Sequence, residues 1–220
     1  KIMFTGITQG LFPVNSLLKD EGLLQYTVVL NETLIKDLKI GASVAIDGVC
    51  QTIVNINGSV VTFEAMLETL DKTTISDLFM GRKVSVERSL RFGDEIGGHE
   101  VSGHIFEKGI IIARKELANN LSLTIQCSDA CFVFIKSKGF IALDGSSLTV
   151  GSLNKAQRSF EVYLIPETLR VTNFENKDVD SHVNLEPDIK TMILVETVQA
   201  NFSDIQARLE KIEKKLENLE

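Results

Sequence analysis

Short runs rich in Val, Ile, Phe and Thr recur along the chain, separated at regular intervals by Gly, Asn and Asp. β-Branched and aromatic residues favour strands, and the small polar residues between them favour turns. The clearest runs are ASVAIDGVCQTIV (42–54), GSVVTFEAM (58–66), RKVSVERS (82–89), GFIALDGSSLTV (139–150) and SFEVYLIP (159–166). Several short strands in each half of the chain predict an all-β protein built from two small closed barrels.

Three segments between these runs predict short helices. They are LNETLIKDL (30–38), ISDL (75–78) and SDACFVFIKSKG (128–139). In the third, Ser128 or Asp129 is expected to cap the helix N-terminus, because both side chains can accept a hydrogen bond from a free backbone N–H.

The C-terminal residues follow a heptad pattern. Apolar residues alternate in steps of three and four: Val195, Val198, Phe202, Ile205, Leu209, Ile212, Leu216 and Leu219. This spacing predicts a long helix with one apolar seam. Leu at a positions with Ile at d positions favours more than two strands, so we expect a parallel homotrimer in which Arg208 faces Glu213 and Lys215 faces Glu220. The alternative is an amphipathic helix that packs on its own barrel.

The chain also repeats itself. Asp144-Gly145 stands 97 residues after Asp47-Gly48 in a similar context, and FTGI (4–7) matches VSGH (101–104) at the same distance. Two further pairs of blocks match at a distance of 99 residues: 66–74 with 165–173, and 84–90 with 183–189. Four blocks in the same order indicate two homologous halves, 1–96 and 97–189, followed by a tail of residues 190–220.

The stretch GGHEVSGHI (97–105) contains two of the three histidines in the chain. The repeat makes it the expected first strand of the second half. His104 stands where the first half has Ile7, so one copy carries an ionisable ring at a position that is apolar in the other. We interpret His99 as a strand or turn residue.

Composition narrows the possible partners. The net charge is −7 and no basic block occurs, so neither nucleic acid nor an anionic membrane surface is an expected partner. No leader segment and no apolar stretch long enough to span a bilayer is seen, and cysteines are few and odd in number, so a cytoplasmic protein is expected.

The chain shows no sign of a metal or cofactor site. Cys127 and Cys131 are four residues apart, and no His or further Cys lies at metal-ligand spacing, so a zinc site is not expected. Phosphate-binding, dinucleotide-binding and HExxH motifs are missing. We therefore expect no metal and no cofactor.

Polar residues within the repeated blocks are the candidates for chemistry. Alternate residues of a strand share one face, so Cys50 lies beside Thr52, and Ser147 beside Thr149. Ser43 and Lys138 stand upstream of these pairs in the first and second half. The alternative is that the hydroxyls satisfy strand backbone near a turn.

Together these blocks resemble one family, riboflavin synthase of the lumazine-binding, double-barrel type. The resemblance rests on MFTGI (3–7), GASVAIDGVC (41–50), GDEIGGHEVSGHI (93–105), KGFIALDGSSLTVG (138–151), LIPETL (164–169) and VNLEPD (183–188). These blocks cover nearly all of the chain through residue 189, in order.

The resemblance implies two six-stranded Greek-key barrels and a C-terminal helix that holds a trimer. It implies a small-molecule substrate and no cofactor: two molecules of 6,7-dimethyl-8-ribityllumazine dismutate, one giving four carbons to the other, to yield riboflavin and a pyrimidinedione. It also implies that the N-terminal barrel of one subunit faces the C-terminal barrel of the next. The family's sites fall on Phe4, Ser43, Cys50, His104, Lys138, Ser147, Thr149, Ile165 and Asp188.

These matches suggest roles for individual residues. His104 or a nearby hydroxyl would remove a proton from the C7 methyl group of one lumazine. Ser147 and Cys50 would add to C7 of the other lumazine or position a water there, with Thr149 as a further catalytic candidate. The expected substrate-binding residues are Phe4, which would cover a ring face, and Thr5, Gly6, Ser43, Thr52, Glu68, Thr69, Lys138, Ile165, Glu167, Thr168 and Asp188.

Two other functions are possible for this fold. Relatives that bind lumazine or flavin as optical antennae do so without turnover, and they tend to lose the second-half site. Here His104, Ser147 and Thr149 are all present, which favours an enzyme. A trimeric scaffold without a ligand would not need matched Cys, Ser and Thr positions.

Overall fold

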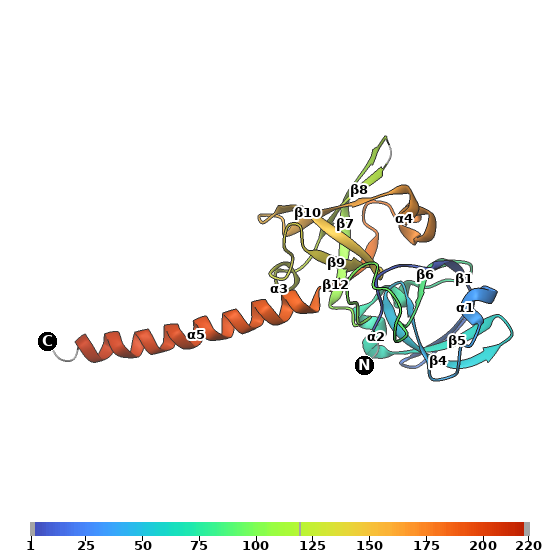
Figure 1. Cartoon of the computed structure of the whole chain (residues 1–220), viewed down its shortest axis with the longest axis horizontal. Coiled ribbons are helices and arrows are strands. Elements are labelled where there is room, and N and C mark those ends of the chain that lie inside the picture. The colour runs from blue at the N-terminus through green and yellow to red at the C-terminus, as the bar shows by residue number, and fades with distance from the viewer. Residues whose placement is uncertain (1–2, 119, 218–220) are drawn as a thin grey trace. The chain divides into compact units, whose positions relative to one another are not determined.

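The structure is a computed structural model that describes residues 3–118 and 120–217. It divides into two compact units, Lys1–Asp188 and Ile189–Glu220. The first unit contains two closed antiparallel barrels of six strands each, as the sequence predicts (Figure 1).

The first barrel has the strand order β1-β2-β5-β4-β3-β6, closed by pairing of β6 with β1. Its strands are β1 (Gly10–Asp20), β2 (Leu23–Val29), β3 (Ser43–Ile46), β4 (Val49–Asn57), β5 (Val60–Met66) and β6 (Lys83–Arg88). Alternate side chains fill the barrel, and Tyr26 stacks on Phe63 at a ring-centroid distance of 5.4 Å.

The second barrel repeats this topology in the order β10-β11-β8-β7-β12-β9. Its strands are β7 (Glu107–Leu117), β8 (Asn120–Gln126), β9 (Phe140–Leu143), β10 (Ser146–Asn154), β11 (Ser159–Leu164) and β12 (His182–Pro187). Each strand has the same neighbours as its counterpart in the first barrel. The internal repeat read from the sequence is therefore confirmed as a repeat of structure.

Short helices connect the strands at equivalent places in both barrels. They are α1 (Glu32–Ile35), α2 (Leu67–Lys72), η1 (Thr74–Asp77), α3 (Asp129–Phe132), α4 (Pro166–Val171) and η2 (Asn173–Asn176). The three predicted helices are present as α1, η1 and α3, but α3 ends at Phe132 and covers only the start of the predicted segment 128–139. Ser128 caps α3, since its hydroxyl accepts a hydrogen bond from Cys131 N. The sequence reasoning missed α2, α4 and η2, and it recognised the residues of α2 and α4 only as matching blocks.

The prediction of a strand over residues 97–105 is wrong. In this stretch only Val101 forms a bridge, an isolated one with Phe4. A side chain added at Gly98 would lie 2.3 Å from the carbonyl oxygen of Thr5, and Gly103 has a φ of +78°. The glycines instead let the backbone approach other segments closely, and this prevents a regular ladder.

The two barrels meet at their tightest turns. Asp47-Gly48 and Asp144-Gly145 are two-residue hairpin loops in which all four residues have positive φ. A Cβ at Gly48 would lie 2.3 Å from Gly145 N, so only glycine permits this contact. The Asp-Gly repeat thus serves both as a turn and as the centre of the interface between the barrels.

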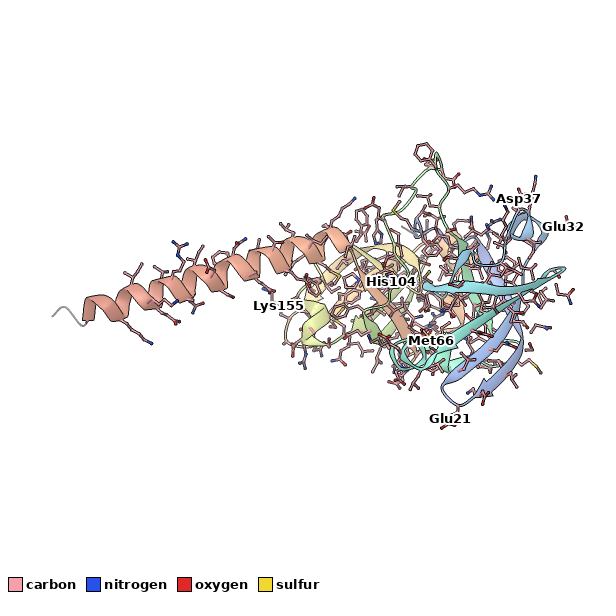
Figure 2. All side chains as sticks on the ribbon, turned by 90° about the horizontal axis from the view of Figure 1, so that it is seen from below. Glu21, Glu32, Asp37, Met66, His104 and Lys155 are labelled. Atoms are coloured by element: carbon pink, nitrogen blue, oxygen red, sulfur yellow. The ribbon has the colours of Figure 1, made fainter. Side chains whose placement is uncertain are left out.

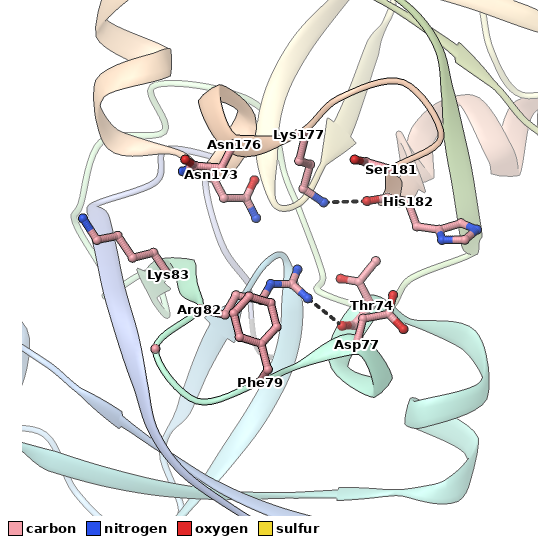
Figure 3. A pocket seen from close by; sticks show the side chains of 11 residues that line it. Thr74, Asp77, Phe79, Arg82, Lys83, Asn173, Asn176, Lys177, Ser181 and His182 are labelled. Carbon is pink, nitrogen blue, oxygen red and sulfur yellow. Dashed lines mark hydrogen bonds between the residues drawn. The ribbon is translucent and has the colours of Figure 1, made fainter.

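Two fully buried carboxylates lie beside this contact. Asp47 pairs with Arg82 at 3.0 Å, and Asp144 pairs with Lys177 at 2.7 Å. Burial, with a smaller contribution from Asp144, raises the pKa of Asp47 to about 6. Arg82 and Lys177 also line a cavity of about 570 Å³ to which both barrels contribute residues (Figure 3).

The second unit is the helix α5 (Ile189–Glu217), which confirms the predicted long C-terminal helix. Its heptad residues Val198, Phe202, Ile205, Leu209 and Ile212 are all exposed in this chain. The side chains of Glu213, Lys215 and Leu216, and residues 219 and 220, lie outside the described part. None of the helices in the described ranges is both long and apolar enough to cross a membrane.

Candidate active site

The N-terminal segment is held by a buried carboxylate of the first barrel. Glu87 on β6 accepts hydrogen bonds from Thr5 N and Thr5 Oγ1, each at 2.7 Å, and from Gly6 N at 3.1 Å. We call residues 5–7 the N-terminal strip. Burial raises the pKa of Glu87, and the hydrogen bonds from Thr5 and Gly6 partly offset this effect.

The second half repeats this arrangement. Glu186 on β12 accepts hydrogen bonds from Ser102 N at 2.6 Å, Ser102 Oγ at 2.8 Å and Gly103 N at 2.9 Å. We call residues 102–104 the middle strip. Burial raises the pKa of Glu186 as well, with Ser102, Gly103 and a charge on His104 acting in the opposite direction.

Each strip docks on a strand of the opposite barrel. Gly6 O accepts a hydrogen bond from Ser147 N on β10 at 2.8 Å, and Gly103 O accepts one from Cys50 N on β4 at 2.9 Å. A Cβ on either glycine would lie 2.6 Å from the Cβ of the residue it faces. Each strip is therefore held by a glutamate of its own barrel and docks on a strand of the other barrel.

Because each strip docks on the other barrel, the candidate residues His104 and Ser147 are not grouped as the sequence suggests. The sequence places His104, Ser147 and Thr149 in one second-half site. Within this chain, however, His104 belongs to the strip that docks beside Cys50, and its side chain is exposed (Figure 2). Ser147 is met instead by the N-terminal strip.

The Cys50 surface consists of Ser43, Cys50, Thr52 and the middle strip. Cys50 and Thr52 share the outward face of β4, while Gln51 between them points into the barrel. Burial raises the pKa of the Cys50 thiol more than its hydrogen bond with Ser43 lowers it. The thiol is therefore protonated near neutral pH, which suits hydrogen bonding rather than nucleophilic attack.

The Ser147 surface consists of His99, Phe140, Ser147, Thr149 and the N-terminal strip. His99 Nδ1 lies 2.7 Å from Ser147 Oγ. The imidazole stacks on Phe140 with 5.5 Å between ring centroids and 15° between planes. His99 is buried, so packing fixes the ring in reach of the hydroxyl. A serine hydroxyl held by a histidine is an arrangement suited to proton transfer.

The contact of His99 with Ser147 was not foreseen. The residue was interpreted as a strand or turn residue because nothing in its own segment points to Ser147. A weak signal was available, since Phe140 stands where the first half has Ser43, and an aromatic ring on that outer face needs a partner. Glu87 and Glu186 were also missed, although both stand at the same place in matched blocks.

Two of the predicted substrate-binding residues are the carboxylates Glu68 and Glu167. They are exposed on α2 and α4, where they pair with Lys72 at 2.9 Å and Arg170 at 2.6 Å. On the same helices Thr69 and Thr168 accept hydrogen bonds through their carbonyls from the threonines four residues later. These hydrogen bonds and ion pairs are local, since each joins residues three or four positions apart.

The other predicted residues have mixed positions. Lys138 is exposed in a left-handed conformation just before β9, and Ile165 is exposed at the start of α4. Asp188 is half-buried at the end of the first unit. Phe4 is fully buried against Ala45, Val101 and Ala142, so in this chain its ring is core rather than a cover for a ligand.

Comparison with known proteins identifies this double arrangement. A family model described as the lumazine binding domain matches residues 5–89 and again residues 102–188. The riboflavin synthase of Escherichia coli (strain K12) is 40% identical over 198 residues, which are 90% of this chain and 92% of that protein. The riboflavin synthase of Buchnera aphidicola subsp. Baizongia pistaciae is 39% identical over 198 residues, with the same coverage.

Solved structures of LumP share the fold. LumP complexed with riboflavin matches with a TM-score of 0.78 and 22% identity, over 84% of this chain and 98% of that chain. LumP complexed with 6,7-dimethyl-8-(1'-D-ribityl) lumazine matches with a TM-score of 0.75 and 22% identity, over 83% and 98%. At this identity the likeness shows the architecture alone. The duplicated domain and the relatives at about 40% identity show that the chain belongs to the riboflavin synthase family.

Proposed function

We propose that this protein is a riboflavin synthase, which converts two molecules of 6,7-dimethyl-8-ribityllumazine into riboflavin and 5-amino-6-ribitylamino-pyrimidinedione. The observation that carries this proposal is the identity of about 40% with riboflavin synthases over 90% of the chain. One substrate transfers four carbons to the other, so the reaction is a dismutation with no external oxidant or reductant. It is supported by a fold that occurs twice, because each copy offers a surface to one substrate molecule.

We assign one lumazine to the first barrel (1–96) and one to the second (97–189). Holding two large molecules in register can contribute roughly 7–11 kcal/mol to lowering the barrier. The Cys50 surface and the Ser147 surface lie on the outside of their barrels, where a second subunit can approach. We therefore propose that the N-terminal barrel of one subunit faces the C-terminal barrel of another.

In this proposal, proton transfer falls to the histidines. His99 holds the Ser147 hydroxyl and acts as its proton acceptor when the hydroxyl, or a water beside it, adds at C7. His104 removes a proton from the C7 methyl group at the facing surface. Cys50 donates a hydrogen bond from its protonated thiol, and Thr52 and Thr149 bond the heterocycle. Lys138, Ile165 and Asp188 complete the binding set in the assembled enzyme.

We also propose that α5 (Ile189–Glu217) assembles the protein into a homotrimer. The support is the exposed apolar seam from Val198 to Ile212, which a single helix leaves in water. Sedimentation or light-scattering mass of the intact chain tests this directly. A mass of three chains is expected, and Leu209→Lys should reduce it.

The alternative function is an antenna-type protein that binds lumazine or flavin without turnover. A single assay separates the two functions: purified protein is mixed with 6,7-dimethyl-8-ribityllumazine, without any added cofactor, and riboflavin absorbance is followed. Steady growth of riboflavin supports the enzyme. A bound-ligand spectrum with no growth would establish the antenna function instead.

A further inference from the structure

A compact group of metal-ligating side chains lies in the second barrel away from the Cys50 and Ser147 surfaces. It comprises Glu107 at the start of β7, Cys127 just after β8, and Cys131 in α3. One ligand atom from each, a carboxylate oxygen and two sulfur atoms, lies within 4.8 Å of the other two. Both cysteines are buried and Glu107 is partly buried.

The repeat shows that the fold itself does not require this group. Cys127 and Cys131 stand 97 residues after Leu30 and Leu34, which are 2% and 3% exposed and form part of the first core. Glu107 stands 97 residues after Gly10, and each of these two residues begins its strand. At the equivalent three positions the first barrel thus has two buried leucines and a glycine, with no metal-ligating side chain.

The surrounding residues hold the three side chains in place. Glu107 accepts hydrogen bonds from Ser128 N at 2.7 Å and Ser128 Oγ at 2.5 Å. Ser128 Oγ in turn accepts one from Cys131 N at 3.1 Å, and the Cys127 thiol donates to Arg158 O at 3.6 Å. Each carboxylate oxygen keeps a lone pair free, because a carboxylate oxygen can accept more than one hydrogen bond.

The donor set selects a chemical class of ligand. Two sulfurs and one carboxylate oxygen match the preferences of Zn²⁺, with Zn–S distances of about 2.3 Å and Zn–O distances of about 2.0–2.2 Å. Tetrahedral geometry at those distances places the two sulfurs about 3.8 Å apart, and the three ligand atoms here already lie within 4.8 Å of one another. Three protein ligands leave the fourth position to water.

We propose that Glu107, Cys127 and Cys131 bind one thiophilic divalent cation, with Zn²⁺ as the expected ion. This departs from the expectation of no metal, because the cysteine spacing alone does not reveal Glu107, which the fold brings beside the two sulfurs. Metal binding replaces two thiol protons by metal–sulfur bonds, releases those protons to solvent, and changes no oxidation state. The ion joins β7, the end of β8 and α3, so its effect is to stabilise this end of the second barrel. The reaction at the Ser147 surface does not depend on it.

Co²⁺ is the probe for this site, because thiolate ligands give it an intense charge-transfer absorption. The full chain, freed of metal and kept reduced, is titrated with Co²⁺ and then with Zn²⁺. We expect a thiolate–cobalt band that saturates at one ion per chain and disappears on addition of Zn²⁺. We also expect Zn²⁺ to raise the unfolding temperature.

A double variant and two single variants make the test specific. Cys127→Leu with Cys131→Leu copies the first barrel, so it should fold and show neither the band nor the rise in unfolding temperature. Glu107→Gln should weaken Co²⁺ binding by more than the roughly 10–100-fold that losing an outer-shell partner costs. Cys50→Ser, which removes the third thiol, should keep the band in full.

Two results would overturn the proposal. One is a chain with no thiolate–cobalt band at saturating Co²⁺. The other is a band that survives in the double leucine variant or is lost in Cys50→Ser, since the metal would then sit elsewhere. Either result leaves the riboflavin synthase assay untouched, so failure here is distinguishable from failure of the proposed function.

Discussion

The first and second barrels have the same strand order, the same Asp-Gly turns and the same buried glutamate that holds a strip of backbone. They differ on their outer faces. Cys50 and Ser43 in the first barrel correspond to Ser147 and Phe140 in the second, and His99 lies against both Ser147 and Phe140. The two barrels are therefore alike at the Asp-Gly contact and in the backbone hydrogen bonds of the strips, and they differ in the side chains on their outer faces.

This division indicates how two like folds can treat two identical substrates differently. A reaction in which one molecule gives and the other receives needs two unequal surfaces. The protonated thiol of Cys50 can only donate or accept a hydrogen bond, whereas the His99–Ser147 pair can move a proton. The two barrels thus differ in the chemistry of their outer side chains, while their strand topology is the same.

The largest expected effect is loss of the His99–Ser147 pair. Ser147→Ala and His99→Ala should each lower kcat by about 10²–10⁴-fold, the usual contribution of a positioned acid–base group. The double variant should be little worse than either single one, because the two groups act as a unit. Steady-state riboflavin formation measures all three.

The matched control is His182→Gln, which changes the remaining histidine at the start of β12 in the cavity of about 570 Å³. It should keep the parental rate. If His99→Ala kept that rate too while Ser147→Ala did not, His99 would have no part in positioning the hydroxyl.

The next largest expected effect is a loss of stability when the contact between the two Asp-Gly turns is disturbed. Gly48→Ala should cost about 3 kcal/mol or more in the free energy of unfolding, because its Cβ would lie 2.3 Å from Gly145 N at a φ of +79°. Gly58→Ala is the control, since Gly58 also has positive φ but faces open space. It should cost only about 1–2 kcal/mol. Equal losses in urea unfolding would show that the barrels do not meet at Gly48.

The buried carboxylate at the same contact predicts a dependence on pH. The pKa of Asp47 is raised from 3.8 to about 6, so between these values the folded chain holds a proton that the unfolded chain releases. Its contribution to the free energy of unfolding is fully present below pH 3.8 and is lost as the pH rises through about 6. The loss is on the order of 3 kcal/mol.

Asp47→Asn removes this titration while keeping the shape of the side chain. The stability of the variant relative to the parent should therefore rise between pH 4 and pH 7 by roughly 2–3 kcal/mol. Urea unfolding of both proteins across this range measures the difference. A difference that stays constant with pH would mean that Arg82 and Lys177 outweigh burial and Asp144 at this site.

The smallest expected effect concerns the first barrel's thiol. Cys50→Ser places at this position the residue that the second barrel has, and a hydroxyl can make the same hydrogen bonds as a protonated thiol. We expect less than about a tenfold change in kcat, with the pH–rate profile unchanged. A loss of 100-fold or more would instead assign Cys50 a nucleophilic role.

Sequence reasoning reached the features that depend on local signals. The cap at Ser128 and the heptads of α5 each follow from residues close together in the chain. The presence of two barrels could be predicted from the repeat, because homologous halves are expected to share one fold. The helix α5 begins at Ile189, six residues before the first heptad position that the pattern identified at Val195.

Apart from short helices such as α2 and α4, the features that the sequence did not predict depend on contacts between distant segments. The docking of each strip on the other barrel joins Gly6 to Ser147 and Gly103 to Cys50, and periodicity along the chain carries no information about such pairing. His99 reaches Ser147 only because the glycine-rich segment folds over β10. The trimer and the roles of the site residues stay predictions, because they concern a second subunit and a bound substrate.

The claim that two like barrels join two copies of one substrate is tested most directly by the stoichiometry of turnover. Purified protein and 6,7-dimethyl-8-ribityllumazine are incubated alone, and the substrate consumed is compared with both products. The account predicts two lumazines consumed for each riboflavin and each pyrimidinedione formed. Substrate that binds and is recovered unchanged, or riboflavin that forms only with an added co-substrate, would contradict it.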